Sequence, residues 1–346
     1  MTRISPGEKN LITDLDGLSV GHAEDAKLRS GVSVIVPDDP AIVSVTVPGG
    51  GPGTRETDAL QPGTLVDRAD AIVLAGGSVY GLDAASGVTA AMGQEGRGYA
   101  TGAPLVSPIV PAAILFDMAN GGDKNWGANP PYARLGQAAY AARDTDFQLG
   151  TIGAGFGAMA GQVKGGLGSA SVAVDGVVEA GALIAANPLG SLVDGQGRFW
   201  AQPHALMHDG ALEFGWPAYA AQTADATAHP MAHTKLATPL GNTTIGVVGV
   251  AADLTAAEAK RVAIMAQDGL ARAIRPLHTP FDGDCLFVLA LGHKKLAETD
   301  AMRPMAVAVL GALVADCVAR AAARGVWLAS ALGEMQAYRD RFSSAP

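Results

Sequence analysis

Leu240-Gly-Asn-Thr-Thr-Ile-Gly-Val-Val248 opens a β-branched run with two hydroxyl side chains, directly after an asparagine. The residues before it, from about 195 to 240, are rich in Ala, His, Pro and Thr and follow no helical or strand period, which indicates a long irregular connection. Thr243–Val250 is then expected to form a strand. Thr at the start of a strand is ordinarily only a good β-former, so a role for Thr243 needs support from the rest of the chain.

The residues after this strand alternate between helix and strand patterns. Thr255-Ala-Ala-Glu258 is a capping box, and it predicts a helix that runs to about Ile274. A strand over Asp284–Leu291 and a helix over Met302–Arg324 follow. The chain from Thr243 onward is therefore expected to fold as β-α-β-α.

The N-terminal part reads as short strands and helices separated by Gly and Pro turns. Two strands within 169–186 are joined by Asp175-Gly176, a strong hairpin signal. Helices stacked on sheets built from both parts of the chain would bury this much small-residue surface, which predicts a single α/β domain with a four-layer αββα sandwich. The other expected elements are strands at Val32–Val36, Ile42–Val47 and Ala71–Ala75, a loop at Pro48–Thr54, and helices that begin at Leu82 and cover 132–143.

Composition limits the classes of partner. The chain has 346 residues, of which 49% are hydrophobic and 16% charged, and its net charge is -9. The acidity gives no electrostatic reason to bind nucleic acid or an anionic membrane. The polar N-terminus lacks the apolar stretch of a signal peptide, and the uncharged run Met305–Ala315 is too short to span a bilayer. We therefore expect a soluble cytoplasmic protein.

Two patterns resemble cofactor or metal sites without meeting their requirements. Gly150–Gly157 has the spacing G-x-x-G-x-G-x-G and precedes a hairpin, whereas a dinucleotide fingerprint precedes a helix. We expect a loop that other backbone approaches closely, which is compatible with the wall of an active site. Asp282-Gly-Asp284 suits a turn between a helix and a strand as well as a metal pair.

The histidines and cysteines give no complete metal site either. Two histidine pairs have helical spacing but lack an obvious third ligand. These pairs are His204 with His208, and His229 with His233. Cys285 and Cys317 form no CxxC motif, so neither a disulfide framework nor a thiolate zinc site is expected. We expect no metal and no cofactor.

Five segments occur in an order that carries a family resemblance. They are Gly76–Asp83 (GGSVYGLD), Gly161–Lys164 (GQVK), Ala186–Asp194 (ANPLGSLVD), Gly241–Ile245 (GNTTI) and His278–Phe287 (HTPFDGDCLF). Together they resemble the self-processing family of D-Ala aminopeptidases, β-aminopeptidases and nylon-oligomer hydrolases, over roughly residues 10 to 325. The resemblance implies an αββα sandwich similar to N-terminal-nucleophile hydrolases. It also implies a precursor that cuts itself into a large subunit, 1–242, and a small subunit, 243–346, which stay together.

The resemblance also assigns roles that agree with the chemistry of these residue types. Cleavage of the Asn242–Thr243 bond gives Thr243 an α-amine with a pKa of about 8, which can act as the base that activates its own hydroxyl. Lys164 would add positive charge beside this amine, and Asn187 would donate its amide to an oxyanion. The remaining site residues are Asp282 and Asp284, which would orient Lys164 or Thr243 or receive a substrate ammonium, and Tyr80, which would contact the acyl intermediate or line the pocket.

The resemblance leaves the substrate and one rival reaction open. D-Ala aminopeptidases and β-aminopeptidases carry Ser as nucleophile, so Thr243 and the Asp-Gly-Asp turn are closer to the nylon-oligomer hydrolases. We expect cleavage of linear amides or short peptides, namely β- or D-aminoacyl peptides and 6-aminohexanoate oligomers, by a homo-oligomer such as a tetramer of heterodimers. The alternatives are an acyltransferase of the ornithine acetyltransferase type and an unprocessed, non-catalytic homologue.

Overall fold

Two packed β-sheets form the centre of the molecule. The computed structural model describes residues 3–215, 229, 231–235 and 241–342. Within them, one sheet has seven strands in the order β1-β11-β12-β15-β16-β4-β6 and the other has five in the order β2-β3-β7-β8-β5. The first comprises β1 (Ile4–Ser5), β11 (Gly166–Val174), β12 (Val177–Asn187), β15 (Thr243–Ala252), β16 (Cys285–Lys294), β4 (Ala41–Thr46) and β6 (Arg68–Ala69). The second comprises β2 (Leu18–Asp25), β3 (Ser30–Pro37), β7 (Ile72–Ala75), β8 (Ala112–Ile114) and β5 (Thr54–Arg55).

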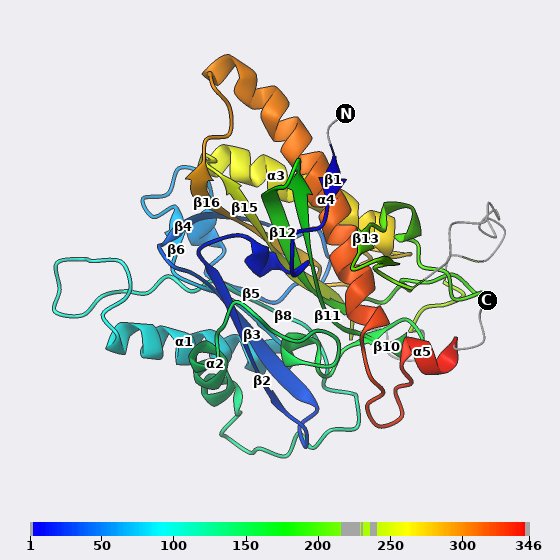
Figure 1. Cartoon of the computed structure of the whole chain (residues 1–346). Coiled ribbons are helices and arrows are strands. Elements are labelled where there is room, and N and C mark those ends of the chain that lie inside the picture. The colour runs from blue at the N-terminus through cyan, green and yellow to red at the C-terminus, as the bar shows by residue number, and fades with distance from the viewer. Residues whose placement is uncertain (1–2, 216–228, 230, 236–240, 343–346) are drawn as a thin grey trace.

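Helices cover the outer face of each sheet (Figure 1). The long helices α3 (Ala256–Ala273) and α4 (Arg303–Trp327) pack on the seven-stranded sheet, and α1 (Asp83–Gln94) and α2 (Tyr132–Ala141) pack on the five-stranded one. A continuous core joins the inner faces of the two sheets, with Ile35 and Leu74 from one sheet and Val247 and Phe287 from the other. The layers therefore run α-β-β-α, as the sequence predicts.

The high glycine content is explained by close contact between helix and sheet. A Cβ on Gly168 in β11 would lie 1.9 Å from the carbonyl oxygen of Ala321 in α4, and one on Gly325 in α4 would lie 2.8 Å from the backbone nitrogen of Gly168. A side chain at either position would push α4 away from β11. Of the described helices, only the segment Asp300–Trp327, which contains α4, is long and apolar enough to cross a membrane, and 61% of its apolar window is buried in the protein.

Two local sequence signals are confirmed, namely the capping box at Thr255 and the hairpin turn at Asp175-Gly176. The Thr255 backbone N–H donates to the Glu258 carboxylate (2.9 Å) and the Glu258 backbone N–H donates to the Thr255 hydroxyl (3.3 Å), which is the predicted capping box. Asp175 and Gly176 have φ values of +51° and +86°, the left-handed pair of a type I′ hairpin turn between β11 and β12.

Several elements were not predicted. The strands β2 and β8 and the small hairpins β9 (Met159–Ala160) with β10 (Val163–Lys164) and β13 (Met207–His208) with β14 (Ala211–Leu212) are additional. The short hairpin β13–β14 and a turn of 3₁₀ helix over Gln202–His204 lie inside the connection predicted to be irregular from 195 to 240. The rest of that prediction falls partly on 216–228, 230 and 236–240, which lie outside the described residues.

Candidate active site

The ends of three neighbouring strands bring the predicted motifs together. Thr243, the first residue of β15, lies opposite Asn187, the last residue of β12, in the antiparallel ladder. One residue earlier, Asn242 forms a parallel bridge with Asp282, just before β16 begins. Segments separated by many residues in the sequence therefore meet at the Asn242–Thr243 bond because β15 lies between β12 and β16.

Two described groups donate hydrogen bonds to the Asn242 carbonyl. The Thr243 hydroxyl donates to it over a short contact, and the backbone N–H of Gly283 donates to it over 3.0 Å. Thr243 is buried, with 4% of its surface exposed. A Cβ on Gly283 would lie 2.7 Å from the Thr243 hydroxyl oxygen, so only glycine fits at this position without displacing the hydroxyl.

The two buried aspartates accept backbone N–H groups near Thr243. Asp284 accepts the N–H of Thr244 (2.7 Å) on one oxygen, and its other oxygen lies 2.8 Å from His278 Nδ1. Asp282 accepts the N–H of Leu189 on one oxygen (3.0 Å) and the hydroxyl of Thr279 on the other (2.6 Å). Burial, with the charge of Asp284, raises the pKa of Asp282 above its usual value. These contacts hold the residues next to Thr243 and Asn187 at the strand ends.

The loop predicted over Pro48–Thr54 packs on this aspartate turn. The backbone N–H of Gly51 donates to the Asp282 carbonyl over 2.8 Å. A Cβ on Gly49 would lie 2.3 Å from the backbone nitrogen of Asp284. The glycines of this loop therefore allow two backbone segments to lie in contact beside the turn that binds the Asn242 carbonyl.

Lys164 is fully buried at the end of β10, beside the glycine-rich segment Gly150–Gly157. Its ammonium donates to the carbonyls of Gly155 (2.9 Å) and Gly165 (2.7 Å). Burial lowers the pKa of Lys164 to about 7, and the charge of Asp117 opposes this shift. Gly155 belongs to the Gly150–Gly157 cluster, so that cluster is the close-approach loop that the sequence predicts rather than a dinucleotide fingerprint.

Asn187 uses its whole side chain in hydrogen bonds. Its Oδ1 accepts the backbone N–H of Met159 (2.9 Å) and the ammonium of Lys235 (3.0 Å). Its Nδ2 donates to the carbonyls of Phe116 (3.0 Å) and Gly241 (3.3 Å). Lys235 was not predicted as a site residue, and nothing in its local sequence distinguishes it. Burial lowers its pKa to about 7.

Tyr80 lies in the short 3₁₀ helix Ser78–Leu82, directly before α1. It is 45% exposed, and its ring packs edge-to-face on Trp126, with the ring centroids 5.3 Å apart. It does not line the cavity that contains Asn187. The role expected for Tyr80 stays a prediction.

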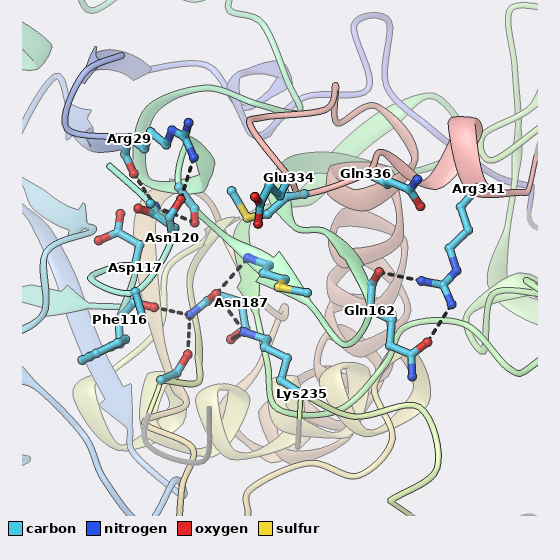
Figure 2. Close-up of a pocket in the computed structure, with 16 residues that line it drawn as sticks. Arg29, Phe116, Asp117, Asn120, Gln162, Asn187, Lys235, Glu334, Gln336 and Arg341 are labelled. Carbon is cyan, nitrogen blue, oxygen red and sulfur yellow. Dashed lines mark hydrogen bonds between the residues drawn. The ribbon is translucent and has the colours of Figure 1, made fainter. Parts of the chain in front are cut away.

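A cavity of about 620 Å³ opens beside Asn187 and Gly241. Figure 2 shows Asn187 and Lys235 reaching toward each other in it, with Arg29 and Arg341 on different sides. Its lining carries charges of both signs, from Arg29, Asp117, Glu334 and Arg341, whereas the Lys235 ammonium in the same wall is bound to Asn187. Such a cavity suits a small, zwitterionic or polar ligand.

The histidines flagged in the sequence lie elsewhere. His204 Nδ1 lies 2.9 Å from the Asp316 carboxylate, and His208 Nε2 lies 3.0 Å from the Glu8 carbonyl oxygen. His229 and His233 line a separate small cavity. Within the described parts of the chain, no three His, Cys, Asp or Glu residues are arranged to hold a metal ion.

Comparisons with known proteins show the family to which the chain is related. The family model of peptidase family S58 matches residues 10–339. An uncharacterized aminopeptidase of Mycobacterium tuberculosis is 42% identical over 97% of this chain and 99% of its own length. A 6-aminohexanoate-oligomer endohydrolase of Kocuria sp. is 31% identical over 85% of this chain and 79% of its own length.

A solved structure shares the fold. The L-aminopeptidase D-Ala-esterase/amidase of Ochrobactrum anthropi, described as a variant of the Ntn hydrolase fold, superposes with a TM-score of 0.69 at 20% identity and covers 99% of this chain and 96% of its own. With the family match over nearly the whole sequence, the chain belongs to peptidase family S58 and is a hydrolase of amide bonds.

Proposed function

We propose that the chain cuts its own Asn242–Thr243 bond and then hydrolyses small linear amides with Thr243 as N-terminal nucleophile. The observation that carries the proposal is the contact of the Thr243 hydroxyl with the carbonyl of Asn242, the residue directly before it. The Gly283 N–H on the same carbonyl oxygen gives that oxygen a donor when it becomes negative.

Self-cleavage follows as an acyl shift. The Thr243 oxygen attacks the carbonyl carbon of Asn242, and the oxygen of that carbonyl becomes an oxyanion held by the Gly283 N–H. The C–N bond then breaks, and the hydroxyl proton ends on the departing nitrogen, which becomes the α-amine of Thr243. Water hydrolyses the resulting ester, so that Asn242 ends in a carboxylate and the Thr243 hydroxyl is restored.

Substrate hydrolysis uses the groups that cleavage exposes. The α-amine, with an ordinary pKa of about 8, accepts the hydroxyl proton as Thr243 attacks the substrate carbonyl. The leaving amine takes that proton, and water then hydrolyses the acyl-enzyme. Lys164, with its pKa lowered to about 7, exchanges protons at neutral pH and supplies positive charge. Asn187 donates Nδ2 to the oxyanion once the Gly241 carbonyl has left it.

The substrate class follows from the cavity and from the relatives. A cavity of about 620 Å³ lined by charges of both signs suits short aminoacyl amides with free ends. A relative named for 6-aminohexanoate oligomers supports linear amides, and relatives named as aminopeptidases support peptides with a free N-terminal residue. Among such peptides we propose β- or D-aminoacyl peptides. We also propose a cytoplasmic enzyme in which both subunits stay together and in which processed heterodimers form a homo-oligomer.

A substrate panel tests this activity. The purified protein is assayed for release of free amine from 6-aminohexanoate oligomers and from β- and D-aminoacyl amides, with Thr243→Ala as the matched control. Turnover by wild type and none by Thr243→Ala is expected. Acyl transfer from acetyl-ornithine to glutamate without hydrolysis would favour the acyltransferase, and an uncut, inactive wild type would favour the non-catalytic homologue.

A further inference from the structure

Lys235 is a buried lysine that the proposed mechanism does not use. It is 8% exposed and lies seven positions before Asn242 in the sequence. Its backbone N–H donates to the Leu189 carbonyl (3.1 Å), which holds it beside the end of β12. A methionine at this position would fill a similar volume without the cost of removing an ammonium from water. Packing alone therefore does not explain why a charged side chain occupies this buried position.

Among the described residues, the Lys235 ammonium donates two hydrogen bonds, and both go to Asn187. The nitrogen lies 3.0 Å from the Asn187 backbone carbonyl oxygen and 3.0 Å from its side-chain oxygen. Figure 2 shows this contact in the cavity wall. With Met159 on the same side-chain oxygen, two donors define which end of the amide is oxygen. The Nδ2 group must then face the carbonyls of Phe116 and Gly241.

The surrounding charges give this contact more than a steric effect. Asp282 and Asp284 favour the charged form of Lys235, while burial and the charge of Lys164 oppose it. A cation on the oxygen end of an amide polarises that amide, which makes its N–H groups stronger donors. Lys235 thus affects both the orientation of the Asn187 amide and the strength of its Nδ2 group as a hydrogen-bond donor.

We propose that Lys235 is a positioning residue that sets Asn187 as the oxyanion donor through its two hydrogen bonds. The inference rests on the proposed function, since it matters only if the Asn187 amide stabilises an oxyanion. It predicts that a free primary alkylammonium ion can bind to the two Asn187 oxygens when the Lys235 side chain is shortened. Lys235 would act on kcat and not on substrate binding.

The test combines amine rescue with a double-mutant cycle. Lys235→Ala is expected to lower kcat by about 10- to 100-fold, as loss of an outer-shell partner does elsewhere, with KM nearly unchanged. Added n-butylammonium should restore part of the rate in a saturable way. The matched control is Lys260→Ala, which removes a partly buried lysine bound to the Val45 carbonyl outside the site and should show neither the loss nor the rescue.

The cycle asks whether Lys235 acts through Asn187. Adding Lys235→Ala to Asn187→Ala should then cost little more than Asn187→Ala alone. Unchanged kcat in Lys235→Ala, or a loss that the amine does not rescue and that adds fully to the loss in Asn187→Ala, would overturn the inference while leaving the proposed function intact. A wild type that neither cuts itself nor hydrolyses any substrate would instead overturn the proposed function and this inference with it.

Discussion

Two of the groups of buried charges in the described chain are paired differently. One is the Arg320 cluster, formed by Asn10, Glu213, Arg320 and Arg324, where α4 crosses the seven-stranded sheet. The Arg320 guanidinium lies 2.6 Å from Glu213, and both side chains are almost completely buried. The other group is the active-site charges, formed by Lys164, Lys235, Asp282 and Asp284. Within the described chain, the ammonium groups of this second group bond to carbonyl and amide oxygens instead of carboxylates.

This difference in pairing goes with a difference in pKa between the two groups. Burial works against the charge of Glu213, but the hydrogen bonds and charge of Arg320 hold its pKa below the usual value. Lys164 and Lys235 contact no carboxylate among the residues that the structure describes, and burial lowers the pKa of each to about 7. A paired charge keeps its ordinary ionisation, whereas an unpaired lysine becomes able to exchange protons near neutral pH.

The largest expected effect is on Lys164. Lys164→Met should lower the rate of self-cleavage and of hydrolysis by about 10²- to 10⁴-fold, the range for loss of a proton-transferring group. The free energy of unfolding should rise, because a methionine needs no solvation. In the folded chain the pKa is about 7 and in the unfolded chain about 10.4. The unfolded chain therefore holds an extra proton between these pH values, and this group makes wild-type stability increase with pH there.

Urea unfolding at pH 6.5 and 9.5 measures this pH dependence, with every chain kept uncut by Thr243→Ala. The difference in stability between the two pH values should shrink when Lys164→Met is added. Equal pH dependence with and without Lys164 would mean that its pKa is not lowered, and the contrast with the Arg320 cluster would fail.

The Arg320 cluster should show the opposite pattern. Glu213→Gln leaves Arg320 buried without its counterion, and it should lower the free energy of unfolding by about 3–5 kcal/mol. Self-cleavage should continue at the wild-type rate at temperatures where the variant is folded. Thermal unfolding and intact mass measure the two effects. Glu298→Gln removes an exposed partner of Lys295 and is the control, with no measurable change in stability. If Glu213→Gln were as stable as wild type but cut itself slowly, the Arg320 cluster would have a role in the reaction and not in stability.

The aspartate pair should give a smaller change in rate. Asp284→Asn keeps one acceptor oxygen for the Thr244 N–H but puts an amide donor where the other oxygen accepts the His278 backbone N–H, and it should slow both reactions by about 10- to 100-fold through displacement of this turn and of β15. We expect Asp282 to act as a carboxylate, and its pKa is raised, so wild-type activity should decline on acidification at a higher pH than an ordinary aspartate would give. Asp282→Asn should be slow but lack that acid limb. Identical acid limbs in the two enzymes would assign the limb to another group.

Tyr80 should give the smallest effect. It is half-exposed and packs on Trp126, so removal of its hydroxyl in Tyr80→Phe should change stability and the rate of self-cleavage by less than about 0.5 kcal/mol. A rate for hydrolysis that falls strongly while self-cleavage is normal would give Tyr80 the substrate role that the family resemblance implies. Comparing the two rates in one preparation makes this distinction.

The sequence predicts the fold wherever local patterns agree with the final packing. The strands with continuous β-branched residues, the capping box at Thr255 and the hairpin at Asp175-Gly176 all follow from near neighbours. The strand β2 was missed because LSVGHAED mixes glycine and charge, and it forms only by pairing with β3 at a sheet edge.

The site could be predicted only in part for a similar reason. The motifs name Lys164, Asn187 and the aspartates as candidates, and the structure places Asn187 and Asp282 at the strand ends beside the Asn242–Thr243 bond. Lys235 gave no signal because its burial depends on contact with Asn187, 48 positions away in the sequence. The backbone donor at Gly283 was equally hidden, since every residue has an N–H and only the β15–β16 register directs this one to Asn242.

Self-cleavage before Thr243 is the central claim, and intact mass tests it most directly. Freshly purified wild type and Thr243→Ala are incubated at neutral pH, and the masses and the N-terminus of any small fragment are determined. The account predicts two wild-type fragments, 1–242 and 243–346, whose masses sum to that of the precursor plus one water, with the smaller beginning at Thr243. Thr243→Ala should remain one chain. A wild type that stays whole, or a Thr243→Ala that is cut at the same bond, would contradict the claim.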